Sequence, residues 1–146
     1  MNISSRVERQ RILALSSREQ IEVCWRALDA LPAYQYLRPP ETGMAMLRGR
    51  IGGTGRAFNF GEMTLTRASV RLDNGTIGHG WVRGRDARHA ELIALSDALS
   101  QLSQWQLSLE ENVIQPLSVA LARRREEVAE KAAATRVDFF TMVRGE

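Results

Sequence analysis

The spacing of apolar and polar positions divides the chain into a helical first third, a β-rich middle and a helical last third. Arg6 to Leu15 is expected to form a short helix. A second helix is expected behind Ser16, which lies three residues before Glu19 in a capping-box spacing. Its apolar residues recur at i, i+3, i+4 and i+7, which predicts one buried helical face. They are Ile21, Cys24, Trp25 and Leu28.

Four strands are expected in the middle of the chain. They cover residues 34–38, 44–51, 63–72 and 76–83, with Pro39 and Pro40 as breakers between the first two. Asp73-Asn74-Gly75 separates the last two strands, and Asn-Gly is a strong signal for a type I′ hairpin turn.

A type I′ turn at this position also predicts the pairing of the hairpin. Leu72 would face Ile77, Val70 would face His79 and Ala68 would face Trp81, all on one apolar face. The other face would carry Arg67, Ser69 and Arg71 opposite Val82, Gly80 and Gly78. Glycines inside a strand often mark the close approach of another backbone or a ligand. We therefore expect a partner to cover this face, with Gly78 and Gly80 as candidate interface residues.

The last third returns to helical periodicity. Asp86 is expected to cap a helix in which leucines at 92, 95, 99, 102 and 109 follow a 3-4 spacing, and Pro116 begins or kinks another helix. The order helix, antiparallel strands, helix predicts an α+β fold, with an antiparallel sheet of about four strands and N-terminal and C-terminal helices. A length of 146 residues suits one domain over 1–146.

Composition narrows the setting in which the protein works. The chain is 44% hydrophobic and 25% charged, as in globular proteins. A single cysteine excludes an intramolecular disulfide and makes the cytoplasm the default location. No signal peptide is recognisable. No apolar run approaches the roughly 20 residues that span a bilayer, so no membrane contact is expected.

Arginine and glycine are concentrated in the middle of the chain. Residues 39–85 hold seven arginines against three acidic residues, a local charge of +4. The loop Gly52-Gly53-Thr54-Gly55-Arg56 could form an anion nest or a flexible strand connection, and it is not a Walker A loop. The candidate phosphate or partner contacts are Gly52, Gly53, Thr54, Gly55, Arg56, Arg67, Arg71, Arg83, Arg85 and His89.

No complete catalytic or metal-binding constellation is recognisable. His79 and His89 lack the spacing of a zinc site, and no second cysteine is available. His79 is expected to be a satisfied core or interface histidine. His89 and Glu91 fit an ordinary capped helix start with local ion pairs better than general acid–base catalysis. We predict no catalytic residue and no metal in this chain.

An apolar cluster lies close to the end of the sequence. It contains Val137, Phe139, Phe140, Met142 and Val143. The cluster could fold back onto the core of its own domain or dock onto a partner, since apolar patches often mark interfaces. Phe139, Phe140 and Met142 are therefore candidate interface residues.

Several segments together resemble the PhnG subunit family of the bacterial carbon–phosphorus lyase system. They are E-T-G at 41–43, G-G-T-G at 52–55, T-L-T-R-A at 64–68, W-V-R-G-R-D at 81–86, H-A-E at 89–91 and R-V-D-F-F-T-M-V-R-G at 136–145. The resemblance covers roughly Leu28 to Gly145, and it tips the C-terminal cluster toward partner docking.

The resemblance implies an accessory subunit that is inactive alone. It would act with PhnI-, PhnH-, PhnJ- and PhnL-like subunits in a symmetric hetero-oligomer. That complex would transfer the ribose 5-triphosphate moiety of ATP to a phosphonate such as methylphosphonate and release adenine. MgATP would be a substrate of the complex, with no cofactor bound by this chain alone. The alternative is a nucleic-acid-binding or ATP-triphosphate-binding module without a catalytic role, although no nucleic-acid-binding motif is recognisable.

Overall fold

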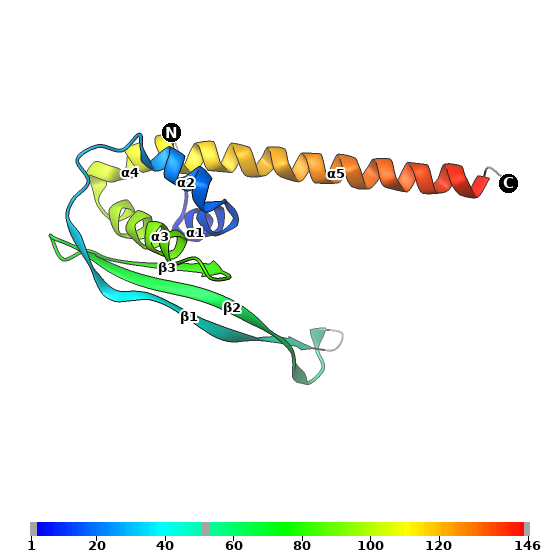
Figure 1. The fold of residues 1–146 in the computed structure, drawn as a ribbon, viewed down its shortest axis with the longest axis horizontal. Coiled ribbons are helices and arrows are strands. Elements are labelled where there is room, and N and C mark those ends of the chain that lie inside the picture. Colours follow the sequence, from blue (N-terminus) through cyan, green and yellow to red (C-terminus); the bar gives the residue numbers. More distant parts are fainter. Residues whose placement is uncertain (1–2, 51–52, 145–146) are drawn as a thin grey trace.

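The computed structural model describes residues 3–50 and 53–144. They form an antiparallel sheet with helices packed on one of its faces (Figure 1). The elements are α1 (Arg6–Leu15), α2 (Arg18–Trp25), β1 (Tyr34–Arg50), β2 (Ala57–Leu72), β3 (Ile77–Arg83), α3 (Ala87–Ser100), α4 (Ser103–Leu109), the π-helix η2 (Glu110–Ile114) and α5 (Gln115–Arg144). Described helices cover one face of the sheet only. The expected α+β fold with N-terminal and C-terminal helices is confirmed.

The described strands form a three-stranded antiparallel sheet in the order β1-β2-β3. The strands expected over 34–38 and 44–51 are joined into the single strand β1. Its pairing with β2 shifts between Tyr36 and Arg38 and again between Arg38 and Glu41, around Pro39 and Pro40. Proline is tolerated here because β1 is an edge strand and the bulges leave residues outside the ladder.

The β2–β3 hairpin lies one residue away from the predicted register. Arg67 pairs with Trp81, Ser69 with His79 and Arg71 with Ile77. The prediction of a type I′ turn was wrong. The N–H of Gly75 donates to the carbonyl of Leu72 at 2.9 Å, and of the turn residues only Gly75 has a positive φ, 93°. This is the three-residue connection that ends in a bulge, and a one-residue slip exchanges the two faces of a strand.

Helix α3 lies directly on the sheet because β3 presents glycines to it. A Cβ atom at Gly78 would lie 2.1 Å from the carbonyl oxygen of Ala94, and one at Gly80 would lie 2.3 Å from that of Ala90. The expected close approach of a backbone is therefore present, but that backbone belongs to the same chain. The assignment of Gly78 and Gly80 to a partner interface was wrong.

Two N-terminal helices cover the rest of the core. Ser5 caps α1, and Ser17 caps α2 in a capping box with Gln20, one residue after the expected position. Ser16 is buried instead and donates to the carbonyl of Ile12 at 2.6 Å. The buried apolar residues include Leu13, Ile21, Leu72, Leu92, Ile93, Leu99, Leu109, Val113, Ile114 and Leu117.

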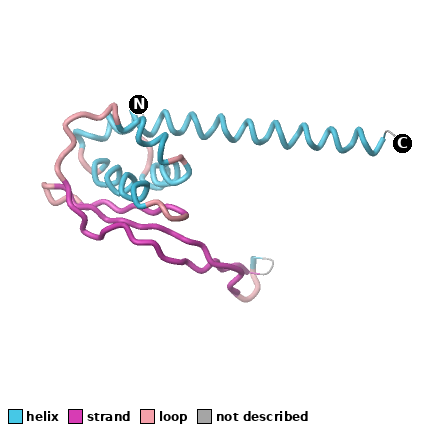
Figure 2. Tube along the Cα trace, viewed as in Figure 1, coloured by secondary structure: helices cyan, strands magenta, loops and turns pink. Residues whose placement is uncertain are grey.

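Two segments project from this body (Figure 2). The first is a two-stranded arm, formed by residues 43–50 of β1 and 57–64 of β2, because β3 pairs with β2 only from Leu65 onward. The second is α5, which is 30 residues long and whose side chains are exposed from 122 to 135. Of the helices that the structure describes, none has the length and apolar character needed to cross a membrane.

Candidate functional site

A groove on the sheet face that points away from the helices gathers three arginines in one hollow. We call it the arginine groove. It has a volume of about 470 Å³ and is lined by Arg6, Leu37, Arg38, Arg67, Ala68, Ser69, His79 and Trp81. Three of these residues are arginines and none is acidic, so the groove is suited to an anion.

The corrected register of the hairpin assembles one wall of the groove. Arg67 and Ser69 alternate on the outer face of β2, opposite Trp81 and His79 of β3. The Arg67 guanidinium lies 6.0 Å from the centre of the Trp81 ring, within the range of a cation–π contact. Ser69 Oγ and His79 Nδ1 are 2.7 Å apart and share a hydrogen bond. Arg38 joins them from β1, where it pairs with Ser69 at the bulge.

Arg6 reaches the groove from the start of α1 and is held by a buried carboxylate. Its Nε and Nη2 atoms donate to Asp97 Oδ1 and Oδ2 at 2.9 and 3.0 Å. This hydrogen-bonded pairing with Asp97 raises the pKa of Arg6 above its already high value, so the guanidinium stays charged. Asp97 Oδ2 also accepts the backbone N–H of His79 at 2.9 Å.

The other two arginines are less constrained. Arg67 has Glu41 at 3.6 Å, and both side chains are largely exposed, so their attraction is weakened by water. Arg38 forms no ion pair with a residue that the structure describes. The groove therefore keeps cationic donors available for a ligand or a partner.

A second polar cluster joins β1 to α3 on the opposite face of the sheet. Tyr34 Oη donates to Glu91 Oε1 at 3.1 Å, and Tyr36 and Arg88 also donate to the Glu91 carboxylate. Hydrogen bonding to Glu91, followed by burial, raises the pKa of Tyr36 to about 12. Burial raises the pKa of Tyr34, and Glu91 adds to that effect. Both phenols and the Nη1 of Arg88 are directed at the carboxylate of Glu91, which suits a structural tie.

This cluster continues into α2 through alternating charges. Arg88 Nε donates to Glu22 Oε1 at 3.2 Å, and Arg18 Nε donates to Asp86 Oδ2 at 3.2 Å. Asp86 caps α3, as expected, by accepting the backbone N–H of His89 at 3.0 Å. The start of α3 is thus a capped helix start with local ion pairs, as expected from the sequence.

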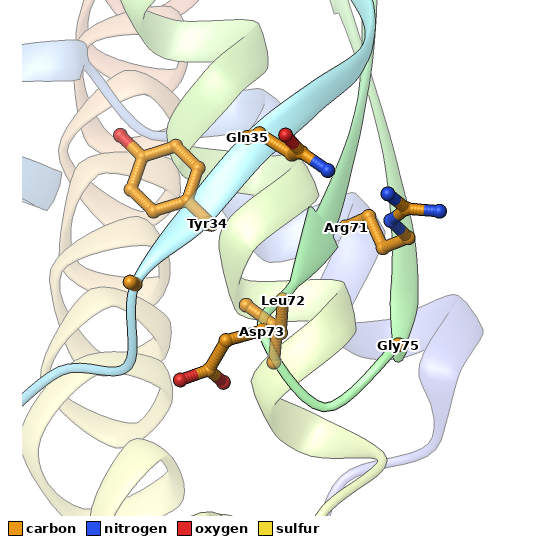
Figure 3. A pocket seen from close by; sticks show the side chains of 7 residues that line it. Tyr34, Gln35, Arg71, Leu72, Asp73 and Gly75 are labelled. Atoms are coloured by element: carbon orange, nitrogen blue, oxygen red, sulfur yellow. The ribbon is translucent and has the colours of Figure 1, made fainter.

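A further hollow lies beside the β2–β3 turn (Figure 3). It has a volume of about 380 Å³ and is lined by Ala33, Tyr34, Gln35, Arg71, Leu72, Asp73 and Gly75. Arg71 pairs with Gln35 across β1 and β2, and the Asp73 carboxylate points away from the Arg71 guanidinium. One arginine and one carboxylate line this hollow, so it lacks the net positive charge of the arginine groove.

The structure separates most of the predicted phosphate contacts. Gly53, Thr54, Gly55 and Arg56 lie at the tip of the two-stranded arm, far from the body, and Gly52 lies outside the described residues (Figure 1). Arg67 lies in the arginine groove and Arg71 near the hairpin turn. Arg83 and Arg85 lie at the end of β3 and in the connection to α3. The loop and the arginines therefore do not form one site.

The structure removes His89 from the candidate phosphate contacts and changes the expected position of His79. His89 is buried, and its Nε2 lies 2.8 Å from the carbonyl oxygen of Leu13, so it joins α3 to α1 and cannot contact a phosphate. His79 was expected on the apolar face, but the register shift places it on the exposed outer face.

Sequence reasoning missed some members of the groove and of the tyrosine cluster. Arg6 and Arg38 come from distant parts of the chain, and no local pattern links them to Arg67. Tyr34 and Tyr36 share a strand face, so their spacing could have suggested a common target. Glu91 was noted only as a helix-start charge, although it is the acceptor for both phenols.

The remaining predicted groups give no separate site. The side chains of residues 136–144 lie outside what the structure describes, so the assignments of Phe139, Phe140 and Met142 stay predictions. Burial raises the pKa of the Cys24 thiol, which packs against the core and is a poor nucleophile there. Within residues 3–50 and 53–144, no group of three or more His, Cys, Asp or Glu could hold a metal ion.

Comparison with known proteins identifies relatives of the whole chain. The family described as phosphonate metabolism protein PhnG matches residues 4–145. A protein of Rhizobium meliloti (strain 1021) is 44% identical over 144 residues, which is 99% of this chain and 92% of the relative. That relative is named alpha-D-ribose 1-methylphosphonate 5-triphosphate synthase subunit PhnG. With a match of this extent, the chain belongs to the PhnG family of phosphonate metabolism proteins.

Proposed function

We propose that this chain is the PhnG subunit of a multi-subunit synthase that joins phosphonates to the ribose 5-triphosphate moiety of ATP. In this reaction an oxygen of a phosphonate such as methylphosphonate bonds to C1 of the ribose, and the bond from C1 to adenine breaks. The observation that carries the proposal is the 44% identity, over 99% of the chain, to a relative named as this subunit.

The shape of the chain supports an accessory role within an assembly. A two-stranded hairpin is only marginally stable by itself in water, and a long exposed helix gains little from tertiary packing. This chain projects one of each, the arm of β1 and β2 and the distal part of α5 (Figure 1). We assign both projections to contacts with the other subunits of the synthase.

We assign the ribosyl transfer chemistry to the assembled complex. The carboxylate of Glu91 already accepts hydrogen bonds from Tyr34, Tyr36 and Arg88, so it is not available to act as a general base. The partners proposed are PhnI-, PhnH-, PhnJ- and PhnL-like subunits in a symmetric hetero-oligomer in the cytoplasm. MgATP is a substrate of that complex, and the glycosidic chemistry belongs to the PhnI-like subunit.

Affinity purification from the native host tests this proposal. Cells expressing a tagged copy of the chain are grown on methylphosphonate as the sole phosphorus source, and the tagged chain is recovered at low salt. We expect the larger PhnI-like subunit to co-purify in fixed proportion, and the purified assembly to release adenine from MgATP with methylphosphonate. Recovery of the tagged chain alone, from cells that contain an active synthase, would contradict the proposal.

A further inference from the structure

We propose that the arginine groove binds a triphosphate group, which ATP and the ribosyl triphosphate product of the proposed synthase both carry. The identity of the ligand rests on the proposed function, whereas the affinity of the groove for triphosphate rests on its own geometry. The groove lies on the uncovered outer face of the sheet, away from the core and from the tyrosine cluster.

The first argument is the convergence of three guanidinium groups from three elements. Arg6 comes from α1, Arg38 from β1 and Arg67 from β2, and all three line the same hollow. Guanidinium groups present planar pairs of donors that match phosphate oxygens, and charge-assisted hydrogen bonds of this kind are about twice as strong as neutral ones. A chain of three linked phosphates offers a separate phosphate group to each of the three arginines.

The second argument is that nearby carboxylates orient the arginines and leave guanidinium donors available toward the hollow. Asp97 uses two of the five N–H donors of Arg6 and leaves the other three available. The Asp97 side chain is 1% exposed, so it is directed at Arg6 from the protein side and does not line the groove. Glu41 faces Arg67 across 3.6 Å in water, and a more highly charged anion can displace it.

The third argument is the wall of the groove. Trp81 and Leu37 are each 51% exposed, and both present apolar surface to the groove. Beside the guanidinium groups they exclude water and strengthen the ion pairs with a ligand. Ser69 and His79 add hydrogen-bonding groups along the same wall. A volume of about 470 Å³ falls within the usual range of small-molecule sites.

The test is calorimetric titration of the full-length chain with tripolyphosphate, ATP, AMP and a single-stranded oligonucleotide at physiological salt. We expect tripolyphosphate and ATP to bind, and AMP to bind at least about tenfold more weakly because it cannot span three arginines. Equal binding of ATP and tripolyphosphate would locate recognition in the phosphates alone. Tighter binding of ATP would identify the nucleotide as the preferred source of the triphosphate.

Variants separate the groove from general positive charge. Arg38→Gln and Arg67→Gln should each weaken tripolyphosphate binding about tenfold, because each removes charge-assisted hydrogen bonds. Arg71→Gln is the matched control, since Arg71 lies on the same strand and face as Arg67 but does not line the groove. It should change the affinity by less than about twofold, as expected for an exposed charge outside the site.

Several outcomes would overturn the inference. They are the absence of tripolyphosphate binding, an Arg71→Gln effect as large as that of Arg67→Gln, AMP binding as tight as that of ATP, and oligonucleotide binding tighter than that of tripolyphosphate. Circular dichroism on each variant checks that its fold is intact. A chain that co-purifies with its partners but binds no triphosphate refutes this inference alone, whereas triphosphate binding without co-purification refutes the proposed function.

Discussion

Arg6 and Asp97 form a two-point ion pair that joins the first turn of α1 to the last turn of α3. The distances are 2.9 Å from Nε to Oδ1 and 3.0 Å from Nη2 to Oδ2. Asp97 also accepts the backbone N–H of His79, on the edge strand β3. The buried carboxylate of Asp97 thus connects α1, α3 and β3. It also positions Arg6, one of the three arginines of the groove.

Replacing Arg6 with methionine should destabilise the fold. The Asp97 carboxylate would stay buried with only one donor left, which we expect to cost about 2 kcal/mol in the free energy of unfolding. The partial exposure of Arg6 keeps this figure below that of a fully buried pair. Urea denaturation measures the change, with Arg71→Met as an exposed control.

The double variant Arg6→Met, Asp97→Asn should be less destabilised than the sum of the single variants, because an amide tolerates the loss of the guanidinium better than a carboxylate does. Strict additivity of the two changes would show that the pair contributes nothing to stability.

Adding one methyl group to Gly80 should disrupt the contact between β3 and α3. A Cβ atom there would lie 2.3 Å from the carbonyl oxygen of Ala90 and 2.6 Å from the backbone nitrogen of Ala94, so the helix would have to move. We expect Gly80→Ala to lower the free energy of unfolding by about 3 kcal/mol.

The matched control is Gly61→Ala on β2, where a Cβ atom would meet only Leu47 Cδ1, at 3.8 Å. Its effect should stay within about 0.5 kcal/mol. If both glycine variants unfold at the same urea concentration, α3 does not pack on the sheet as described.

Sequence periodicity was sufficient for the fold class and for the two faces of β2, and insufficient for the faces of β3. Apolar spacing predicted α1 with its observed bounds, and Asp86 was recognised as a cap because capping depends on adjacent residues. The predicted faces of β3 depended on the geometry of a single turn. Asn74-Gly75 fits both a two-residue and a three-residue connection, and tertiary packing of α3 on Gly78 and Gly80 selects the latter.

Fewer residues of the candidate site than elements of the fold could be predicted from the sequence. Arg67 was recognised by its place in an arginine-rich stretch, but Arg6 and Arg38 meet it only through the packing of α1 and the bulge in β1. His89 was misassigned because a helix-start histidine can point outward or inward. The carbonyl of Leu13, 76 residues away, decides that it points inward.

The two tyrosines of the chain should titrate above their ordinary range. Their phenol protons are held by Glu91, which raises the pKa of Tyr36 to about 12. Because the folded pKa exceeds the unfolded value of 10.0, the neutral phenol stabilises the fold below pH 10, and that contribution is lost as the pH rises from 10 through about 12.

Absorbance of tyrosinate near 295 nm reports only Tyr34 and Tyr36, since the chain has no other tyrosine. We expect both midpoints above 10 in the folded chain and a return to about 10 in urea. Glu91→Gln should lower the folded midpoints. Native midpoints near 10 would show that the phenols do not donate to Glu91.

Shortening α5 should abolish assembly with the partner subunits while leaving the thermal stability of the isolated chain nearly unchanged. The helix contributes Leu117 to the core and Leu121 beside it, whereas side chains 122–135 are exposed. Ending the chain after Leu121 should therefore shift the Tm of the isolated protein by less than about 4 °C, yet abolish co-purification with the PhnI-like subunit.

Ending the chain after Thr135 tests the predicted role of Phe139, Phe140 and Met142. A large loss of Tm on either truncation would place the removed segment in the core.

Adenine release by reconstituted subunits tests the central claim most directly. The PhnI-, PhnH- and PhnL-like subunits are incubated with MgATP and methylphosphonate in the presence or absence of this chain, and the chain is also assayed alone. We expect adenine release only when this chain completes the set, with no turnover by the chain by itself. Equal rates with and without this chain, or robust adenine release by the isolated chain, would contradict its assignment as an accessory subunit of the synthase.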